Sequence, residues 1–231
     1  MERTVIETDE YTIVETDNCS LEEIVEFVVK ENYLHHQKSL PENISEEIEE
    51  LIKEEQRLLS TSRFFVARDR NGLLIGCIRL HHWNHKSDLP ITKFGVGVAE
   101  IFPQNKYPNI WHVGRFAIKS HTSNDAIIIL KTLMICAIAP IVKTHSSIML
   151  AEIDAKLIRS LRRMDIGLTP IGKPFYYIGS ETFPICAAAS GLKSFYHRYF
   201  TLLGSAMEYL TSKRVYLTIF ILSIFAIHPF G

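Results

Sequence analysis

The sequence predicts an α/β fold, with helices on both faces of a mixed, mostly antiparallel sheet and a hydrophobic appendage at the C-terminus. Three observations predict this class. Asn71-Gly72 joins two β-prone runs, as in a tight hairpin. After this hairpin, apolar residues recur with the period of a strand in some segments and of a helix in others. No internal repeat or flexible linker divides the chain, so we expect one domain over residues 1–190 and a helical, hydrophobic tail over residues 191–231.

Composition narrows the functional classes. The 231 residues suffice for one substantial domain, and 25 Lys and Arg nearly balance 26 Asp and Glu. No global basic field recruits nucleic acid, so we expect no nucleic-acid partner. The four cysteines are far apart, as is typical of reduced thiols. The acidic N-terminus lacks the apolar core of a signal peptide, which predicts a cytoplasmic protein and leaves membrane association open.

The first 60 residues predict a short strand and two helices. Residues 11–14 are β-prone, and Ser20 with Glu23 forms a capping box for the first helix. A second helix over residues 45–59 carries apolar residues at helical spacing. Six acidic residues surround them: Glu46, Glu47, Glu49, Glu50, Glu54 and Glu55. We interpret this acidic run as a solvated helix face rather than a docking patch.

The predicted hairpin consists of residues 63–68 and 73–80, and a long loop follows over residues 81–107. Long loops in compact domains commonly form lids or binding walls, so this loop is a candidate substrate wall. A central strand is predicted next, over residues 109–118.

Residues 126–142 are almost wholly apolar. Lys131 near the middle and Pro140 near the end of this segment favour a helix packed on the sheet over a membrane span. The remaining elements of the domain are a strand over residues 147–153, an amphipathic helix over 155–164, and strands over 175–178 and 183–187.

The tail has a different character. A mixed aromatic helix is predicted over residues 194–209, and residues 215–230 are nearly pure hydrocarbon. As a helix, the second segment would rise about 24 Å, less than the ~30 Å hydrocarbon core of a bilayer. Three alternatives stay open: a buried or interface-forming segment, peripheral membrane contact through residues 215–230, or disorder.

The strand over residues 109–118 contains a His, a Gly and an Arg inside apolar sequence. Together with the hairpin it resembles the GNAT acyltransferase superfamily, and within it the autoinducer (acyl-homoserine-lactone) synthases and long-chain N-acyl amino acid synthases. That subgroup has a Gly-x-x-Arg-Leu strand, a loop with Pro and Phe, and a Trp-Glu-x-Ser-Arg-Phe-x-Val strand. The matching segments are Gly76-Cys77-Ile78-Arg79-Leu80, Leu89-Pro90, Ile101-Phe102-Pro103 and Trp111-His112-Val113-Gly114-Arg115-Phe116-Ala117-Ile118. The resemblance covers about residues 11–190.

The resemblance implies an N-acyltransferase with a GNAT-like sheet. Such an enzyme moves an acyl group, here expected to be long, from an acyl-carrier-protein or coenzyme A thioester to the amine of an amino acid or related small molecule. The thioester is a co-substrate, so no tightly bound cofactor is expected. His112 stands where autoinducer synthases carry Glu, and an imidazole can take a proton from the incoming amine. Gly114 permits a bulge that would aim a backbone N–H at the oxyanion.

The resemblance also implies substrate contacts. The candidate substrate-binding residues are Arg79, Trp111, Arg115, Phe116, Glu152 and Tyr177. Arg79 and Arg115 could clamp a carboxylate or phosphate, with a structural ion pair as the alternative. Tyr176 and Tyr177 are adjacent in a strand, so only one can face the site. We expect Tyr176 to be catalytic, because a phenol could protonate the leaving thiolate.

Two departures from the family pattern bear on the donor and the product. Ser60-Thr61-Ser62 stands where autoinducer synthases carry an Asp-x-x-Asp pair, and Gly114 replaces their strand Ser, which argues against lactone synthesis. Residues 119–124 contain no Gly, so a coenzyme A diphosphate would lose its usual nest of backbone N–H groups. An acyl carrier protein tolerates this loss better. An acidic carrier could contact a set of cations that comprises Lys119, Arg159, Arg162 and Arg163.

Two rival hypotheses remain. The first is a non-catalytic GNAT-like module that binds lipid or a partner, since the family's Glu, Ser and glycine loop are missing. The second is an integral membrane protein that uses residues 126–142 and 215–230 as spans. We expect no metal site, because the neighbouring His81 and His82 point to opposite faces of a strand.

Overall fold

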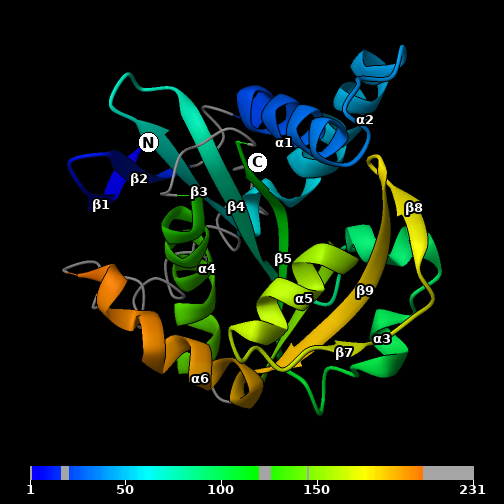
Figure 1. The fold of residues 1–231 in the computed structure, drawn as a ribbon. Helices are drawn as coiled ribbons and strands as arrows, with labels where there is room; N and C mark the ends of the chain where they lie inside the picture. Colours follow the sequence, from blue (N-terminus) through cyan, green and yellow to red (C-terminus); the bar gives the residue numbers. More distant parts are fainter. Residues whose placement is uncertain (1, 17–20, 120–125, 145, 205–231) are drawn as a thin grey trace, which may run out of the picture.

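The described residues form one mixed sheet with helices on both faces (Figure 1). The computed structural model describes residues 2–16, 21–119, 126–144 and 146–204. In sheet order, the strands are β1 (Arg3–Glu7), β2 (Tyr11–Thr16), β3 (Ser62–Asp69), β4 (Leu74–Trp83), β5 (Asn109–Ile118), β6 (Ser147–Asp154), β9 (Ser180–Ala188) and β7 (Thr169–Pro170), with β8 (Phe175–Tyr177) paired to β9. Among these pairs only β5 and β6 run parallel, which confirms the predicted fold class.

The helices divide between the two faces of the sheet. One face packs against α1 (Leu21–His36) and α2 (Ile44–Leu58), and the other against α4 (Ala126–Lys143), α5 (Ala155–Arg163) and α6 (Ala189–Tyr199). Short helical turns complete the structure: η2 (Leu59–Thr61), η3 (Pro90–Phe94), α3 (Val98–Ile101) and η4 (Phe200–Leu203). Each face therefore has its own apolar core, and the central strands β4 and β5 contribute to both.

The hairpin is present as the sequence predicts, whereas β4 continues to Trp83, into the predicted loop. β3 and β4 pair antiparallel around a turn in which Gly72 has a φ of +78°. The segment between β4 and β5 contains η3 and α3, and its Leu89, Ile91 and Phe102 are buried against Leu150 of β6. This segment is thus a packed wall beside the sheet.

The apolar helix α4 lies in the core. It is the one helix among the described residues that is long and apolar enough to cross a membrane, and 61% of it is buried inside the protein. Leu133, Ile135 and Ile138 are fully buried in the core shared with the sheet and α6. The ammonium of Lys131 lies 4.8 Å from the ring centre of Tyr199, outside that core. These contacts are those of the core helix that the sequence favours.

The C-terminal part of the core differs from the expectation. α6 begins at Ala189, earlier than the predicted helix over residues 194–209. Leu192 and Phe195 are fully buried against the same core as α4. α6 therefore packs on the same apolar core as α4 and covers apolar surface that would otherwise be exposed. Residues 205–231, including the apolar segment 215–230, lie outside the described residues, as does Ser20 of the predicted capping box.

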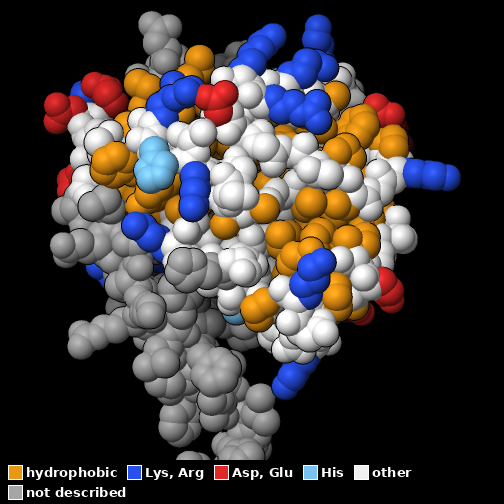
Figure 2. Space-filling model, turned by 90° about the horizontal axis from the view of Figure 1, so that it is seen from below, with side chains coloured by type: hydrophobic (Ala, Val, Ile, Leu, Met, Phe, Trp, Pro, Cys, Tyr) orange, Lys and Arg blue, Asp and Glu red, His pale blue; other side chains and the backbone are white. Residues whose placement is uncertain are grey.

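Hydrophobic side chains also reach the surface. Figure 2 shows a patch of them on the lower face of the molecule, next to several Lys and Arg side chains. Over the whole surface of the described residues, the exposed large hydrophobic residues include Leu34, Leu40, Leu73, Ile101, Ile127 and Ile128. Exposed apolar residues are common in folded proteins, so this patch by itself assigns no partner.

Candidate active site

The candidate site lies where two central strands separate. The parallel ladder between β5 and β6 ends at the pair His112↔Leu150. β5 continues to Ile118 and β6 to Asp154, but they no longer pair with each other. The edge of β5 beyond His112 therefore presents backbone groups to a gap instead of to a neighbouring strand.

A β-bulge lies in β5 at the same level. The step from Cys77 to Arg79 on β4 is matched by the longer step from Ala117 to Gly114 on β5. The expected bulge is thus present. Its left-handed residue is Arg115, with a φ of +51°, rather than Gly114. A bulky residue is strained in this conformation, so the contacts of the Arg115 side chain must hold it there.

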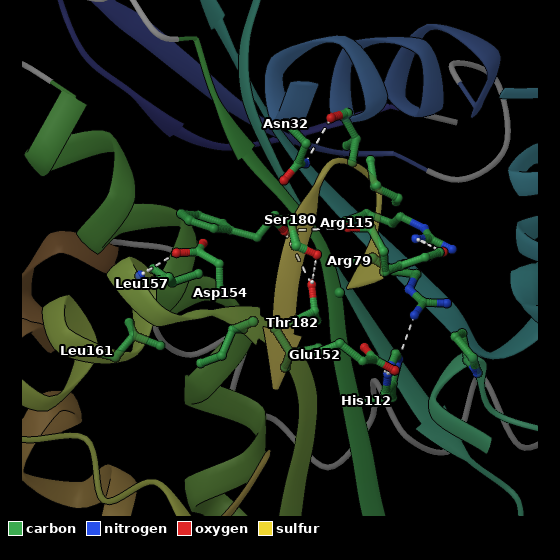
Figure 3. A pocket seen from close by; sticks show the side chains of 18 of the residues that line it. Asn32, Arg79, His112, Arg115, Glu152, Asp154, Leu157, Leu161, Ser180 and Thr182 are labelled. Carbon is green, nitrogen blue, oxygen red and sulfur yellow. Dashed lines mark hydrogen bonds and ion pairs between the residues drawn. The ribbon is translucent and has the colours of Figure 1, made fainter. Parts of the chain in front are cut away.

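A cavity of about 100 Å³ fills the gap between the strands (Figure 3). Its polar wall includes Arg79, His112, Arg115 and Glu152. Its apolar wall comes from both sides of the gap and includes Val113, Met134, Met149, Ile153 and Leu161. The cavity is therefore polar on the side of α2 and apolar on the side of α4.

A second, outer cavity of about 330 Å³ adjoins the inner one between α1, α5 and the end of β5. The two cavities share Asn32, Phe116, Asp154 and Leu157 in their walls. The two cavities therefore lie side by side, with these four residues between them.

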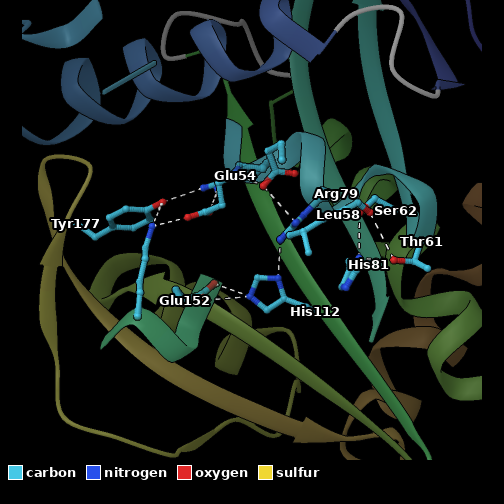
Figure 4. Close-up of polar contacts among 12 residues, drawn as sticks. Glu54, Leu58, Thr61, Ser62, Arg79, His81, His112, Glu152 and Tyr177 are labelled. Carbon is cyan, nitrogen blue, oxygen red and sulfur yellow. Dashed lines mark hydrogen bonds and ion pairs between the residues drawn. The ribbon is translucent and has the colours of Figure 1, made fainter. Parts of the chain in front are cut away.

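His112 is held between a cation and a carboxylate (Figure 4). Its Nδ1 lies 2.6 Å from Nη2 of Arg79, and its Nε2 lies 2.8 and 2.9 Å from the two carboxylate oxygens of Glu152. A guanidinium can only donate hydrogen bonds, so Nδ1 is the acceptor and Nε2 carries the proton. The lone pair of Nδ1 is therefore occupied by Arg79.

Opposing effects act on Glu152, which is almost completely buried. Burial by itself raises the pKa of this carboxyl group. The facing His112, with the cations Arg79 and Arg115, outweighs burial and holds the pKa of Glu152 below its ordinary value. Glu152 is thus an ionised carboxylate in the cavity wall at neutral pH.

Arg115 is the centre of a buried polar network. Its Nε donates to Glu55 at 2.8 Å, its Nη2 contacts Glu54, and its Nη1 donates to the Tyr177 hydroxyl at 3.2 Å. Lys93 contacts the same Glu54 and Tyr177, at 2.7 and 3.1 Å. Burial lowers the pKa of Arg115, but Tyr177, Glu55 and Glu54 together raise it well above its ordinary value. The network ties α2, η3, β5 and β8 around one cation.

Arg79 shares the same carboxylate. Its side chain is completely buried, and Nη1 lies 3.2 Å from Oε1 of Glu55. Of the two roles that the sequence leaves open for Arg79 and Arg115, the structure therefore shows the ion pair. Neither guanidinium can clamp a substrate carboxylate without giving up Glu54 or Glu55.

The presence of a glycine at position 114 has a steric reason. A Cβ at this position would lie 3.0 Å from Nη2 of Arg79 and 3.4 Å from Cε1 of His112. Both distances are short for a carbon atom, so a side chain would push Arg79 and His112 apart. The missing Cβ leaves the space in which these two residues meet.

The other predicted residues divide into two groups. Phe116 and Tyr177 line the inner cavity together with Glu152. Tyr176 lies outside it, since its side chain is 66% exposed and its hydroxyl contacts Gln37. Trp111 is also outside the cavity and packs beside His82 in the core, because neighbouring strand residues face opposite sides. The structure thus brings Tyr177 to the site in place of Tyr176.

The sequence interpretation misses the acidic partners of the arginines. Glu55 is completely buried and Glu54 is partly buried, although both belong to the acidic run read as a solvated face. One signal was available in the sequence. Glu55 lies four residues after Leu51 and three before Leu58, so it occupies the apolar stripe of α2.

His81 is a structural residue of the same region. Its Nδ1 lies 3.1 Å from the hydroxyl oxygens of Thr61 and Ser62. Burial, with a smaller effect of Arg79, lowers the pKa of His81 to about 2, so this imidazole stays neutral. Within the described ranges, no three His, Cys, Asp or Glu side chains gather as metal ligands do.

Comparison of the sequence with protein-family models and with curated proteins finds no match. Solved structures do match. FeeM, an N-acyl amino acid synthase from uncultured soil microbes, is 14% identical with a TM-score of 0.57, over 79% of this chain and 92% of that one. FdhC, a nucleotide-linked sugar GNAT, is 13% identical with a TM-score of 0.52, over 88% and 100%. The coenzyme A-dependent acyl-homoserine lactone synthase BjaI is 10% identical with a TM-score of 0.50, over 80% and 88%. The chain therefore has the fold of the GNAT acyltransferases.

Proposed function

We propose that the chain is an N-acyltransferase, which moves an acyl group from a thioester to an amine. The supporting observation is the gap between β5 and β6, with a bulge on one side and Glu152 on the other. Acyl transfer to an amine requires a donor for the oxyanion and an acceptor for a proton beside the reacting carbon. β5 offers the first through its unpaired backbone, and β6 offers the second.

The proposed reaction uses three groups of the site. The bound ammonium first loses a proton to solvent, and the neutral amine then attacks the thioester carbonyl carbon while a backbone N–H of the Gly114-Arg115 bulge binds the developing oxyanion. Formation of the C–N bond leaves a positive charge on the attacking nitrogen, and Glu152 takes one of its protons and passes it to solvent. The C–S bond then breaks, and the thiolate takes a proton from the Tyr177 phenol, which is restored from solvent. The products are an amide and a free thiol.

This mechanism gives His112 a positioning role. Its Nδ1 is occupied by Arg79, so it cannot take the amine proton as the sequence comparison suggested. Its Nε2 proton instead holds both oxygens of Glu152 in one orientation. The carboxylate of Glu152 is the base that remains in the wall of the cavity.

We further propose a long-chain acyl donor carried by an acyl carrier protein. The apolar wall contains Met134 and Met149, whose flexible side chains can move aside for a chain. Lys156 and Ser160 of α5 line the outer cavity, so this helix borders the space beside the inner cavity. α5 also exposes Arg159, Arg162 and Arg163, which suits an acidic carrier better than a neutral one.

The test uses the purified full chain. It is incubated with acyl-carrier-protein and coenzyme A thioesters of short and long acyl chains, together with amino acids and other small amines. Released thiol is measured, and mass spectrometry identifies the amide. We expect thiol release that depends on the amine and is lost in Glu152→Gln. Release no faster than with heat-denatured protein, for every pair, would show that the chain is not an acyltransferase.

A further inference from the structure

We infer, on the basis of the proposed acyl transfer, that its acceptor is a small cationic amine without a carboxylate group. The inference comes from the charges around the inner cavity, where every cation is already paired and a carboxylate faces the cavity.

The cations of the inner cavity are paired within the protein. Among the described residues these cations are Arg79 and Arg115. Each of the three side-chain nitrogens of Arg115 contacts a group of the protein: Glu55, Glu54 or Tyr177. Arg79 is completely buried between Glu55 and His112. A carboxylate that entered the cavity would therefore have to compete with Glu54 or Glu55 for these cations.

The anions of the same cavity are less fully paired. Among the described residues, Glu152 contacts Nε2 of His112 through both carboxylate oxygens and forms no direct ion pair with Arg79 or Arg115. Asp154 lies two residues further along the same face of β6. It accepts hydrogen bonds from the first turn of α5 through Oδ1, and its Oδ2 lies 3.8 Å from Nε2 of His36. Burial lowers the pKa of His36 despite this neighbour, so the imidazole is neutral at neutral pH.

The geometry of an amino acid conflicts with this arrangement. Its carboxylate is one carbon away from its ammonium, so an ammonium at Glu152 would place a carboxylate inside the inner cavity. There it would meet Glu152 and no free cation, and a buried charge without a partner opposes binding. Lys156 lines the outer cavity and not the inner one. An amine that lacks the carboxylate keeps the contact with Glu152 and leaves no charge unpaired.

Matched acceptors isolate this difference. Phenylalanine is compared with phenethylamine, and lysine with cadaverine, because each pair differs only in the carboxylate. We expect kcat/KM with one common thioester to favour the amine by about tenfold or more. An amino acid that reacts as well as its amine would overturn the inference while leaving acyl transfer intact.

Binding of the acceptors is also measured in the absence of a thioester donor, for the case in which no acceptor is acylated. Such a result would contradict the proposed function, but calorimetric titration with the same four compounds still tests the acceptor site. Tighter binding of each amine than of its amino acid would support the inferred site. Equal or weaker binding of the amines would overturn it.

Two variants locate the charge responsible. Glu152→Gln removes the charge but keeps an oxygen that can accept from His112, so the preference for amines in donor-free calorimetric binding should shrink to about threefold or less. Glu181→Gln changes an exposed carboxylate of β9 and should leave the preference unchanged. Thermal unfolding of both variants confirms that they are folded. An unchanged preference in Glu152→Gln would exclude Glu152 as its source.

Discussion

Gly114 and Arg115 are neighbours in the bulge of β5, and both are needed for the buried polar contacts beside the cavity. The bulge turns Arg115 toward α2, where Glu54 and Glu55 hold it. Gly114, one position earlier, leaves room for the contact between Arg79 and His112. Removal of one Cβ therefore makes space for a buried chain of polar contacts that a bulkier strand residue would block.

Gly114→Ala should disrupt this chain of contacts. The new Cβ would lie 3.0 Å from the Arg79 guanidinium, and we expect a loss of about 1–3 kcal/mol in the free energy of unfolding together with a loss of acyl transfer. Gly76→Ala is the matched control, since its Cβ would lie 3.0 Å from Leu133 in the core. It should lower stability and keep the activity of the folded protein. Urea unfolding and thiol release measure both, and full activity in Gly114→Ala would contradict the steric account.

Glu152 links stability to pH. Its pKa in the folded protein lies below the ordinary value of 4.5. Its contribution is therefore present above pH 4.5 and is lost as the pH falls through the lower, folded-state pKa. We expect the melting temperature of the wild type to fall more steeply in this acidic range than that of Glu152→Gln. Melting curves of both proteins are recorded across this pH range. If the two melting temperatures fall in parallel, the pKa of Glu152 is not lowered in the folded protein.

Tyr177 and Tyr176 are neighbours with opposite surroundings. Tyr177 contacts Arg115 and Lys93 at the cavity, whereas Tyr176 is largely exposed. Tyr177→Phe removes the proposed proton donor and should reduce thioester turnover by about tenfold or more, with Tyr176→Phe close to the wild type. Steady-state thiol release compares the two. A larger loss in Tyr176→Phe would reverse the assignment.

At the scale of elements, α2 joins the two arginines of the sheet through one side chain. Glu55 lies on the apolar stripe of this helix and contacts Arg79 and Arg115 at once. η3 and β8 meet the same network through Lys93 and Tyr177. The polar network beside the cavity therefore joins five elements that are distant in sequence: α2, η3, β4, β5 and β8.

Loss of the shared carboxylate should have a large effect. Glu55→Gln leaves two buried guanidinium groups short of one negative charge, and we expect a cost of about 3–5 kcal/mol in the free energy of unfolding. The exposed pair Arg198–Asp165 provides the control, since Asp165→Asn should change stability very little. Urea titration of both variants makes the comparison. Equal effects would mean that the buried network contributes no more than a surface ion pair.

At the scale of the whole molecule, the outer cavity beside α5 adjoins the inner cavity in the gap between β5 and β6. The exposed cations Arg159, Arg162 and Arg163 belong to the same helix as Lys156 and Ser160, which line the outer cavity. A carrier protein docked there would present its thioester arm to the outer cavity, and the acyl carbonyl would reach the bulge. In this arrangement the acceptor meets the carbonyl from the side of Glu152.

Charge reversal on α5 tests this docking. The triple variant Arg159→Glu, Arg162→Glu and Arg163→Glu should raise KM for an acyl-carrier-protein donor by about tenfold at low salt. KM for the same acyl group on free pantetheine should not change, because that donor makes no contact with α5. Steady-state kinetics with both donors decides. Equal changes for the two donors would place the carrier elsewhere.

The sequence by itself determined the main elements of the sheet and the place of the site. Hydrophobic periodicity and turn residues predict three elements: the Asn71-Gly72 hairpin, the core helix α4, and strand β5 with its polar residues in apolar sequence. The motif around His112 also led to the GNAT fold and to the cavity beside β5. These features follow from neighbours in the chain, so they could be predicted from the chain.

The tertiary structure alone decided which groups are paired and which face the cavity. Glu55 has the spacing of a buried residue, but only the fold supplies Arg79 and Arg115 as its partners. Contacts with distant elements place Tyr177 rather than Tyr176 at the cavity and occupy Nδ1 of His112 with Arg79. The physical reason is that burial and ion pairing depend on side chains brought together across the sheet, and a linear pattern does not contain those distances.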